Sequence, residues 1–122
     1  MRYGSATVMK STGDRSLAVT VRVAVERPDR PESSYLRGSA RGAPDCYRAA
    51  ALSGVRFARY AIDRHRFGIE VCEVSGTLDD PTGDQGAAIA AMFAVWRAWD
   101  YRWTDAEAQQ TMGWSLQGAS DV

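Results

Sequence analysis

A strict alternation of apolar and other residues marks one segment near the start of the chain. Five large apolar side chains occupy every second position there: Leu17, Val19, Val21, Val23 and Val25. Because successive side chains of a β-strand point to opposite faces, this pattern predicts a strand with one buried face. The other face carries four small or polar side chains: Ala18, Thr20, Arg22 and Ala24. We expect a sheet covered on one side, whose open face leaves two alternatives, a monomer and a homodimer.

Turn-forming residues and further alternation extend this sheet. Residues 1–11 alternate weakly, and the composition of 12–15 predicts a tight turn, so a β-hairpin with the strand at 17–25 is expected. Residues 27–32 contain two prolines, which do not continue a strand, and a loop is predicted there. Further strands are predicted at 35–41 and 69–74.

Residues 45–65 have the periodicity of an amphipathic helix. Asp45 follows Pro44 and is the candidate N-cap. Apolar side chains share one face: Tyr47, Ala51, Val55, Ala58 and Ile62. Three arginines lie almost in line on the opposite side: Arg48, Arg59 and Arg66. His65 is the only histidine, and its position at the end of the helix favours a structural role.

Residues 85–99 predict a second helix that is apolar on nearly every side. Thr82 and Gln85 form a capping-box pattern at its start. Large side chains line one face: Ile89, Met92, Trp96 and Trp99. Small side chains line another: Ala87, Ala91, Ala94 and Ala98. We expect the large face to pack on the sheet, the small face to pack on the first helix, and the two helices to run antiparallel.

The last part of the chain contains a second capping-box pattern, formed by Thr104 and Glu107. It predicts a short helix that ends near residue 112, followed by a frayed tail from which Trp114 and Leu116 can dock. Residues 104–122 are therefore expected to be a short helix and a tail.

The composition suits one soluble domain. The chain has 122 residues, of which 45% are apolar and 25% are charged. Together with the predicted elements, this indicates an α+β two-layer sandwich, with a single domain over 1–103. No apolar run approaches the ~20 residues that a membrane helix needs. The first residues form no apolar signal region, so a cytoplasmic protein without a membrane partner is expected.

Charge is balanced overall but unevenly distributed. Residues 1–66 carry 13 basic and 6 acidic residues, whereas residues 67–122 carry 2 and 9. This distribution indicates either a basic surface for phosphate or ordinary solvated arginines, since the chain has no dense basic run. Cys46 and Cys72 lack a metal-type spacing and are expected to be small buried hydrophobic residues. One histidine cannot build a multi-histidine metal site, so neither a metal nor a cofactor is expected.

Two stretches of sequence, together with the valine-rich strand before them, resemble domain IV of translation elongation factor G. They read SYLRGSARGAPDCYRAAALSGVRFA and SGTLDDPTGDQGAAIAAMFAVWRAW. A long helix with a small-residue step, an Asp- and Gly-bearing loop and an Ala-rich helix carry the resemblance, roughly over residues 13 to 99. It implies the order strand-strand-strand-helix-strand-helix with a left-handed crossover, which is the ribosomal protein S5 domain 2-like fold. The sequence contains no GTPase phosphate loop.

The resemblance also implies a functional tip, formed by the loops at 12–16 and 75–82. In the family, the second loop reaches the decoding region of the ribosome. Here that loop lacks the family's tip histidine and carries Asp79 and Asp80, which would repel phosphate. The first loop keeps one arginine. The candidate nucleic-acid-binding residues are Arg15, Arg48, Arg59 and Arg66.

The leading functional hypothesis is a non-catalytic binding or interaction module, with RNA or a ribonucleoprotein as the candidate partner. Enzymes of this fold use features that this sequence lacks, such as the Gly/Ser-rich phosphate loop of GHMP kinases and the several histidines of imidazoleglycerol-phosphate dehydratase. No catalytic residue is therefore assigned. Two alternatives stay open: an unrecognised small-molecule enzyme on the same fold, and a self-associating protein-interaction module.

Overall fold

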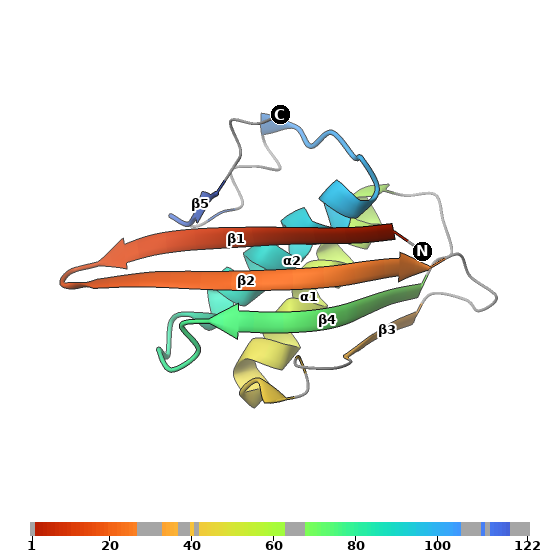
Figure 1. The fold of residues 1–122 in the computed structure, drawn as a ribbon. Helices are drawn as coiled ribbons and strands as arrows, with labels where there is room; N and C mark the ends of the chain where they lie inside the picture. The colour runs from red at the N-terminus through yellow and green to blue at the C-terminus, as the bar shows by residue number, and fades with distance from the viewer. Residues whose placement is uncertain are drawn as a thin grey trace.

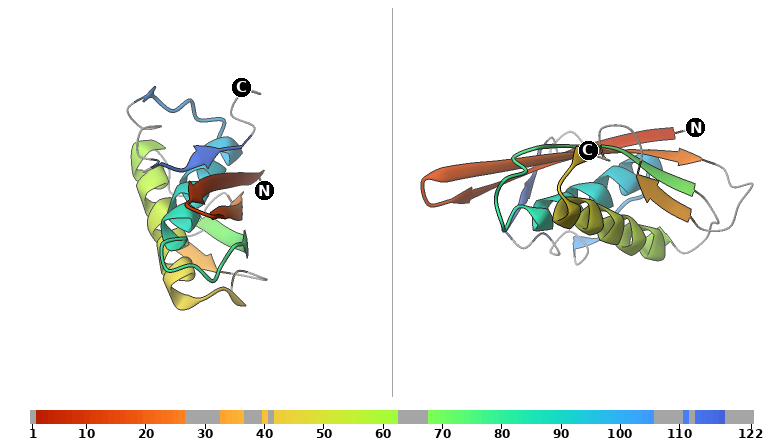
Figure 2. Two further views of the ribbon diagram at one scale, coloured as in Figure 1. Left: turned by 90° about the vertical axis from the view of Figure 1, so that its left-hand side faces the viewer. Right: turned by 90° about the horizontal axis from the view of Figure 1, so that it is seen from below.

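The computed structural model describes residues 2–26, 33–36, 40, 42–62, 68–105, 111 and 113–117. Within these residues, five strands form one sheet and both helices lie on the same face of it (Figures 1 and 2). The predicted α+β two-layer sandwich is therefore confirmed.

The strand order across the sheet is β3-β4-β2-β1-β5 (Figure 1). β1 (Arg2–Thr12) and β2 (Arg15–Glu26) form the predicted hairpin, and Gly13 adopts a φ of +58° in its turn, a conformation that favours glycine. β4 (Gly68–Gly76) is antiparallel to β2, and β3 (Ser33–Leu36) is parallel to β4. The third strand begins earlier than predicted, and most of the predicted segment beyond Leu36 lies outside the described residues.

The alternation along β2 has its predicted consequence. All five apolar side chains at alternate positions of β2 are at most 4% exposed. On the other face, the guanidinium of Arg22 is exposed and lies 4.7 Å from the ring centroid of Tyr3, and the hydroxyls of Thr7 and Thr20 share a hydrogen bond of 2.7 Å. No described helix covers this face, so the sheet is covered on one side, as expected. The choice between a monomer and a dimer stays a prediction.

The connection from β3 to β4 passes through α1 (Asp45–Ile62) and is left-handed. In Figure 1 the helices lie behind the sheet, β3 and β4 both point left, and the chain returns through α1 to enter β4 on the upper side of β3. Because β3 and β4 are parallel, α1 and α2 (Asp84–Ala98) both begin at the left end of the sheet in this view and run the same way.

The prediction that the two helices run antiparallel is therefore wrong. Contacts between α1 and residues 83–96 follow the same order along both segments. The residue pairs in contact or close approach are Tyr47 with Gly83, Gly54 with Ala88, and Ala58 with Trp96. A parallel pair of helices follows from the parallel β3 and β4, a pairing that periodicity does not predict.

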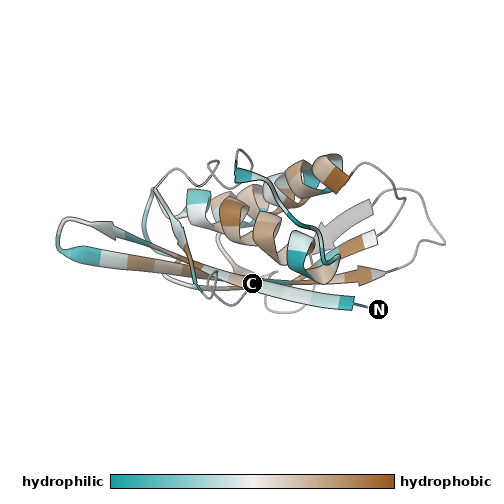
Figure 3. Cartoon of the chain, turned by 90° about the horizontal axis from the view of Figure 1, so that it is seen from above, coloured by the Kyte–Doolittle hydropathy of each residue, from teal (hydrophilic) through white to brown (hydrophobic). Residues whose placement is uncertain are grey.

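The two faces of α2 are also the reverse of the prediction. The small side packs on the sheet, because a Cβ at Gly4 of β1 would lie 2.1 Å from the carbonyl oxygen of Ala94 and 2.9 Å from the Cβ of Ala98. The Trp side faces α1: the indole Nε1 of Trp96 donates to the carbonyl oxygen of Ala58 at 3.1 Å. Since α2 is covered by the sheet and by α1, it is apolar on nearly every side, and hydrophobicity does not distinguish these faces. Figure 3 shows hydrophilic positions at the hairpin turn, at the start of β1 and on parts of the helices.

The helix starts differ from the predicted caps. The first helical residue of α1 is Asp45, and the backbone N–H groups of Tyr47 and Arg48 donate to the carbonyl oxygen of Pro44. The N-cap of α2 is Gly83, which makes no side-chain cap. The hydroxyl of Thr82 donates to the carboxylate of Asp80 and does not form the predicted capping box. Both helices begin with an acidic residue near their positive ends.

The segment after α2 turns back over the helix. Asp100 has a φ of +53°, and the chain then stacks Trp103 on Trp96 with ring centroids 5.8 Å apart. Trp114 is 3% exposed and packs against Gly86, and β5 (Ser115–Leu116) pairs with β1. The predicted docking of the tail is confirmed, whereas most of the predicted helix at 104–112 lies outside the described residues. Among the described residues, no helix is long and apolar enough to cross a membrane.

Both cysteines are reduced thiols, and neither is fully buried. Cys46 is exposed in the first turn of α1, and Cys72 in β4 is partly exposed. The prediction of a buried hydrophobic role is therefore wrong for Cys46. It follows Asp45 in the first turn of the helix, one position before the core residue Tyr47.

Candidate functional site

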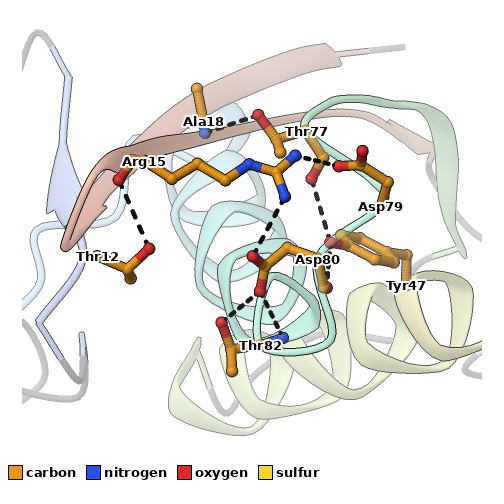
Figure 4. Close-up of polar contacts among 8 residues, drawn as sticks. All are labelled: Thr12, Arg15, Ala18, Tyr47, Thr77, Asp79, Asp80 and Thr82. Atoms are coloured by element: carbon orange, nitrogen blue, oxygen red, sulfur yellow. Dashed lines mark hydrogen bonds and ion pairs between the residues drawn. The ribbon is translucent and has the colours of Figure 1, made fainter.

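The two loops expected to form a tip do meet in space. The β1–β2 turn and the β4–α2 loop lie at the end of the sheet where both helices begin (Figure 1). Figure 4 shows their contact: Arg15 reaches from β2 to the carboxylates of Asp79 and Asp80. Nη1 of Arg15 lies 3.5 Å from Oδ2 of Asp80, and Nη2 pairs with Oδ1 of Asp79. The sequence prediction named these three residues, but not that they pair with one another.

Asp80 organises the start of α2. One of its carboxylate oxygens accepts a hydrogen bond from the backbone N–H of Thr82 at 2.9 Å and another from the Thr82 hydroxyl at 2.6 Å. The pKa of Asp80 is lowered below its ordinary value of 3.8. The largest cause is the hydrogen bond from the Thr82 hydroxyl, followed by the one from the Thr82 backbone, and the positive charge of Arg15 adds to both. The side chain is therefore an ionised acceptor at neutral pH, and it fixes the geometry of the loop.

Tyr47 connects α1 to the β4–α2 loop. Tyr47 is 1% exposed. Its hydroxyl lies at hydrogen-bond distance from two carbonyl oxygens, 3.1 Å from that of Thr77 and 2.9 Å from that of Asp80, and can donate to either. Burial raises the pKa of Tyr47, so it stays a neutral donor. Gly83 makes this contact feasible, because a Cβ there would lie 2.1 Å from the Tyr47 oxygen.

Thr77 ties the same loop to the hairpin. Its backbone N–H donates to the carbonyl oxygen of Ala18 at 2.7 Å, and its hydroxyl accepts from the N–H of Ala18 at 3.3 Å. Thr77 and Thr82 lie within the predicted tip loop at 75–82, but their hydrogen bonds were not predicted, and Tyr47 was not identified from the sequence as part of the tip. Tyr47 was assigned only to the apolar face of the helix, because periodicity places a ring and does not place its hydroxyl.

The tip is thus a closed network with one cation between two carboxylates. Its polar groups bond to one another and to the backbone, which stabilises the loops. The guanidinium of Arg15 is engaged by carboxylates, so a phosphate would have to displace them. Within the described residues, no group of three or more His, Cys, Asp or Glu side chains is arranged to hold a metal ion.

The structure does not bring the predicted arginines together. Arg48 pairs with Asp45 in the first turn of α1, and Arg59 lies partly buried 11 residues further along the helix, about 16 Å away along its axis. Arg15 belongs to the tip, on a separate element. Arg66, like His65, lies outside the described residues.

Two aromatic residues on α1 were missed by the sequence prediction. Phe57 is 47% exposed and Tyr60 is 88% exposed, although both lie in a described helix beside a large core. Arg56, which is exposed, is one residue before Phe57 and four before Tyr60, so the three side chains lie on adjacent positions of the helix surface. We call Arg56, Phe57 and Tyr60 the outer face of α1. The signal in the sequence was the position of two aromatic residues away from the apolar stripe.

Comparisons with solved structures identify the fold. The Thermus thermophilus protein ttk003000868 matches with a TM-score of 0.57 and 22% identity, over 76% of this chain and 14% of that protein. Homoserine kinase from Cytophaga hutchinsonii matches with a TM-score of 0.54 and 10% identity, over 92% of this chain and 40% of the kinase. No family model matches the sequence, and a search of curated proteins finds no match.

This chain spans less than half of each of these two proteins, and at such identities the likeness shows the fold alone. The element order and the left-handed crossover agree with the likeness. The chain therefore has the ribosomal protein S5 domain 2-like fold.

Proposed function

We propose that this domain is a non-catalytic module that binds RNA, alone or within a ribonucleoprotein, through the outer face of α1. The observation that carries the proposal is the exposure of Phe57 and Tyr60 beside Arg56. Exposed aromatic rings next to a guanidinium supply both the stacking and the positive charge that RNA-binding surfaces use. A small-molecule enzyme needs polar groups directed at a substrate, whereas the polar atoms of Tyr47 and Thr82 point to the loop itself.

The charge of the tip supports α1 over the tip as the binding surface. Arg15 lies between the carboxylates of Asp79 and Asp80, which leaves this cluster with one net negative charge. On α1, by contrast, the described residues after Asp45 include three arginines and no acidic residue. These charges favour phosphate binding along α1 over binding at the tip.

The test is fluorescence anisotropy with a labelled RNA hairpin that has an unpaired loop. Wild-type protein should bind at low salt, and two phosphate contacts would weaken binding about sevenfold between roughly 50 and 200 mM salt, from a slope of about −0.7 per phosphate. The variant Arg56→Gln should bind more weakly, and its slope of log affinity against log salt concentration should be less steep by about 0.7, the contribution of one phosphate contact. Arg15→Gln is the matched control, because it removes an arginine of the tip and should leave the affinity unchanged.

Two results would contradict the proposal. If the wild type fails to bind the hairpin at low salt, RNA is not the partner, and the protein-interaction alternative gains. If Arg15→Gln weakens binding and Arg56→Gln does not, RNA contacts the tip and not α1.

A further inference from the structure

We propose that the outer face of α1 binds single-stranded RNA, with unpaired bases stacked on Tyr60 and Phe57 and a phosphate paired with Arg56. This inference rests on the proposed function and adds to it the strandedness of the RNA and the groups that contact it. Three features of the described residues support it: the exposure of the rings, the support beneath one of them, and the charge around both.

Tyr60 projects into solvent to an unusual degree for an aromatic residue. Its side chain is 88% exposed, so it contributes almost nothing to the core, although α1 has a buried face with room for large side chains such as Tyr47. An aromatic ring held on a regular helix presents its face at a defined place, and every RNA base has a face that can stack on it. Stacking of a base would cover apolar surface that the folded domain leaves in water.

Phe57 is the second ring, and the core supports it from behind. Its ring centroid lies 6.4 Å from that of Trp96, which is fully buried, while 47% of Phe57 is exposed. Trp96 is itself fixed by its hydrogen bond to the carbonyl oxygen of Ala58, one residue after Phe57. The inner side of Phe57 is therefore held in place, and its outer side is available. Phe57 and Tyr60 are three residues apart on the helix, which makes them neighbours on its surface.

The charge around these rings is complementary to a phosphodiester chain. Arg56 is exposed and precedes Tyr60 by one helical turn. Among the described residues of α1, only Asp45 is acidic. It lies in the first turn of the helix, away from Tyr60, and pairs with Arg48. Among the described residues of this part of α1, the exposed charge beside the rings is therefore the positive one of Arg56.

Stacking on Tyr60 and Phe57 also selects the strandedness of the RNA. In a duplex the base faces are covered by neighbouring base pairs, so only the phosphates would be accessible, and only Arg56 could bind them. An unpaired strand can present both bases and phosphates to the same patch. A protein partner would use the same residue types, since Tyr and Arg are enriched at protein interfaces, but it would not require unpaired bases.

The experiment compares a single-stranded RNA of about ten nucleotides with a duplex of the same sequence. Wild-type protein should bind the single strand more tightly. Tyr60→Leu keeps apolar bulk but removes the ring, and it should weaken single-strand binding about fivefold to 150-fold, because loss of one stacked base costs about 1–3 kcal/mol. Tyr60→Phe keeps the ring and should bind like the wild type. Duplex binding should not change in either variant.

The possible failures of the two proposals are distinguishable. If the wild type binds neither RNA at low salt, the proposed function itself is wrong. If it binds both RNAs equally, and Tyr60→Leu has no effect while Arg56→Gln weakens binding, then RNA binding stands and the stacking inference is overturned. Since Tyr60 is 88% exposed, its variants should keep the wild-type circular dichroism spectrum and melting temperature.

Discussion

Replacement of Gly54 by alanine tests how closely α1 approaches α2. Gly54 is buried at the middle of α1, and a Cβ built there would lie 2.0 Å from the carbonyl oxygen of Ala88 and 2.7 Å from its carbonyl carbon. Both are backbone atoms of a helix, so no side-chain rotation can relieve the clash. The variant Gly54→Ala must move one helix away from the other.

Two effects of opposite sign decide the stability of this variant. Alanine is favoured over glycine in a helix interior by about 1 kcal/mol, which on its own would stabilise the domain. Overpacking a dense core costs about 1–3 kcal/mol, and more where the backbone must shift. Here α2 cannot retreat easily, because Ala94 and Ala98 already contact β1 at Gly4. We therefore expect overpacking to prevail, with a net loss of about 2 kcal/mol or more in the free energy of unfolding.

Urea unfolding followed by far-UV circular dichroism measures this difference. Gly42→Ala is the matched control, because a Cβ there would meet no heavy atom within 4 Å. That variant should be neutral, or more stable by up to about 1 kcal/mol, through the lower entropy of the unfolded chain. The reasoning would be refuted if Gly54→Ala were stabilised by about 1 kcal/mol, as helix propensity alone predicts.

Two further substitutions test the core and the tip. Trp96→Ala should lower the free energy of unfolding by about 3–5 kcal/mol, since the side chain is fully buried, and Trp96→Phe should lower it less. Urea unfolding measures both variants. An unchanged stability of the alanine variant would show that this face of α2 is exposed. Asp80→Asn should destabilise the domain at neutral pH, because the pKa of Asp80 is lower in the folded state than in the unfolded state. The stabilising contribution of the carboxylate is therefore present above about pH 4 and is lost as the pH falls through the folded-state pKa. Melting temperatures between about pH 7 and pH 2 should therefore converge for wild type and variant at low pH, and a difference independent of pH would contradict this reasoning.

Local periodicity by itself determined the type and approximate position of the main elements. The alternation of Leu17 to Val25 and the helical period of residues 45–62 depend only on backbone geometry, which repeats every two residues in a strand and every 3.6 in a helix. For the same reason the sheet could be predicted to have one open face. The resemblance to elongation factor G domain IV added the topology, which periodicity does not contain.

Tertiary structure alone decided how these elements face one another. The parallel run of α1 and α2 follows from the pairing of β3 with β4, a contact between segments separated by a whole helix. The side of α2 that meets the sheet was undetermined, because a helix that is apolar all round fits either way until the close approach at Gly4 selects the alanines.

The candidate site shows the same division. Sequence identified Arg15, Asp79 and Asp80 as charged loop residues, but their mutual pairing joins residues 64 and 65 positions apart, on two loops that meet at one end of the sheet. The position of Phe57 and Tyr60 away from the apolar stripe was visible in the sequence, but how far each is exposed depends on the core that forms beside them. Charge and hydrophobicity are properties of each residue, whereas pairing and exposure depend on which distant segments the fold brings beside it.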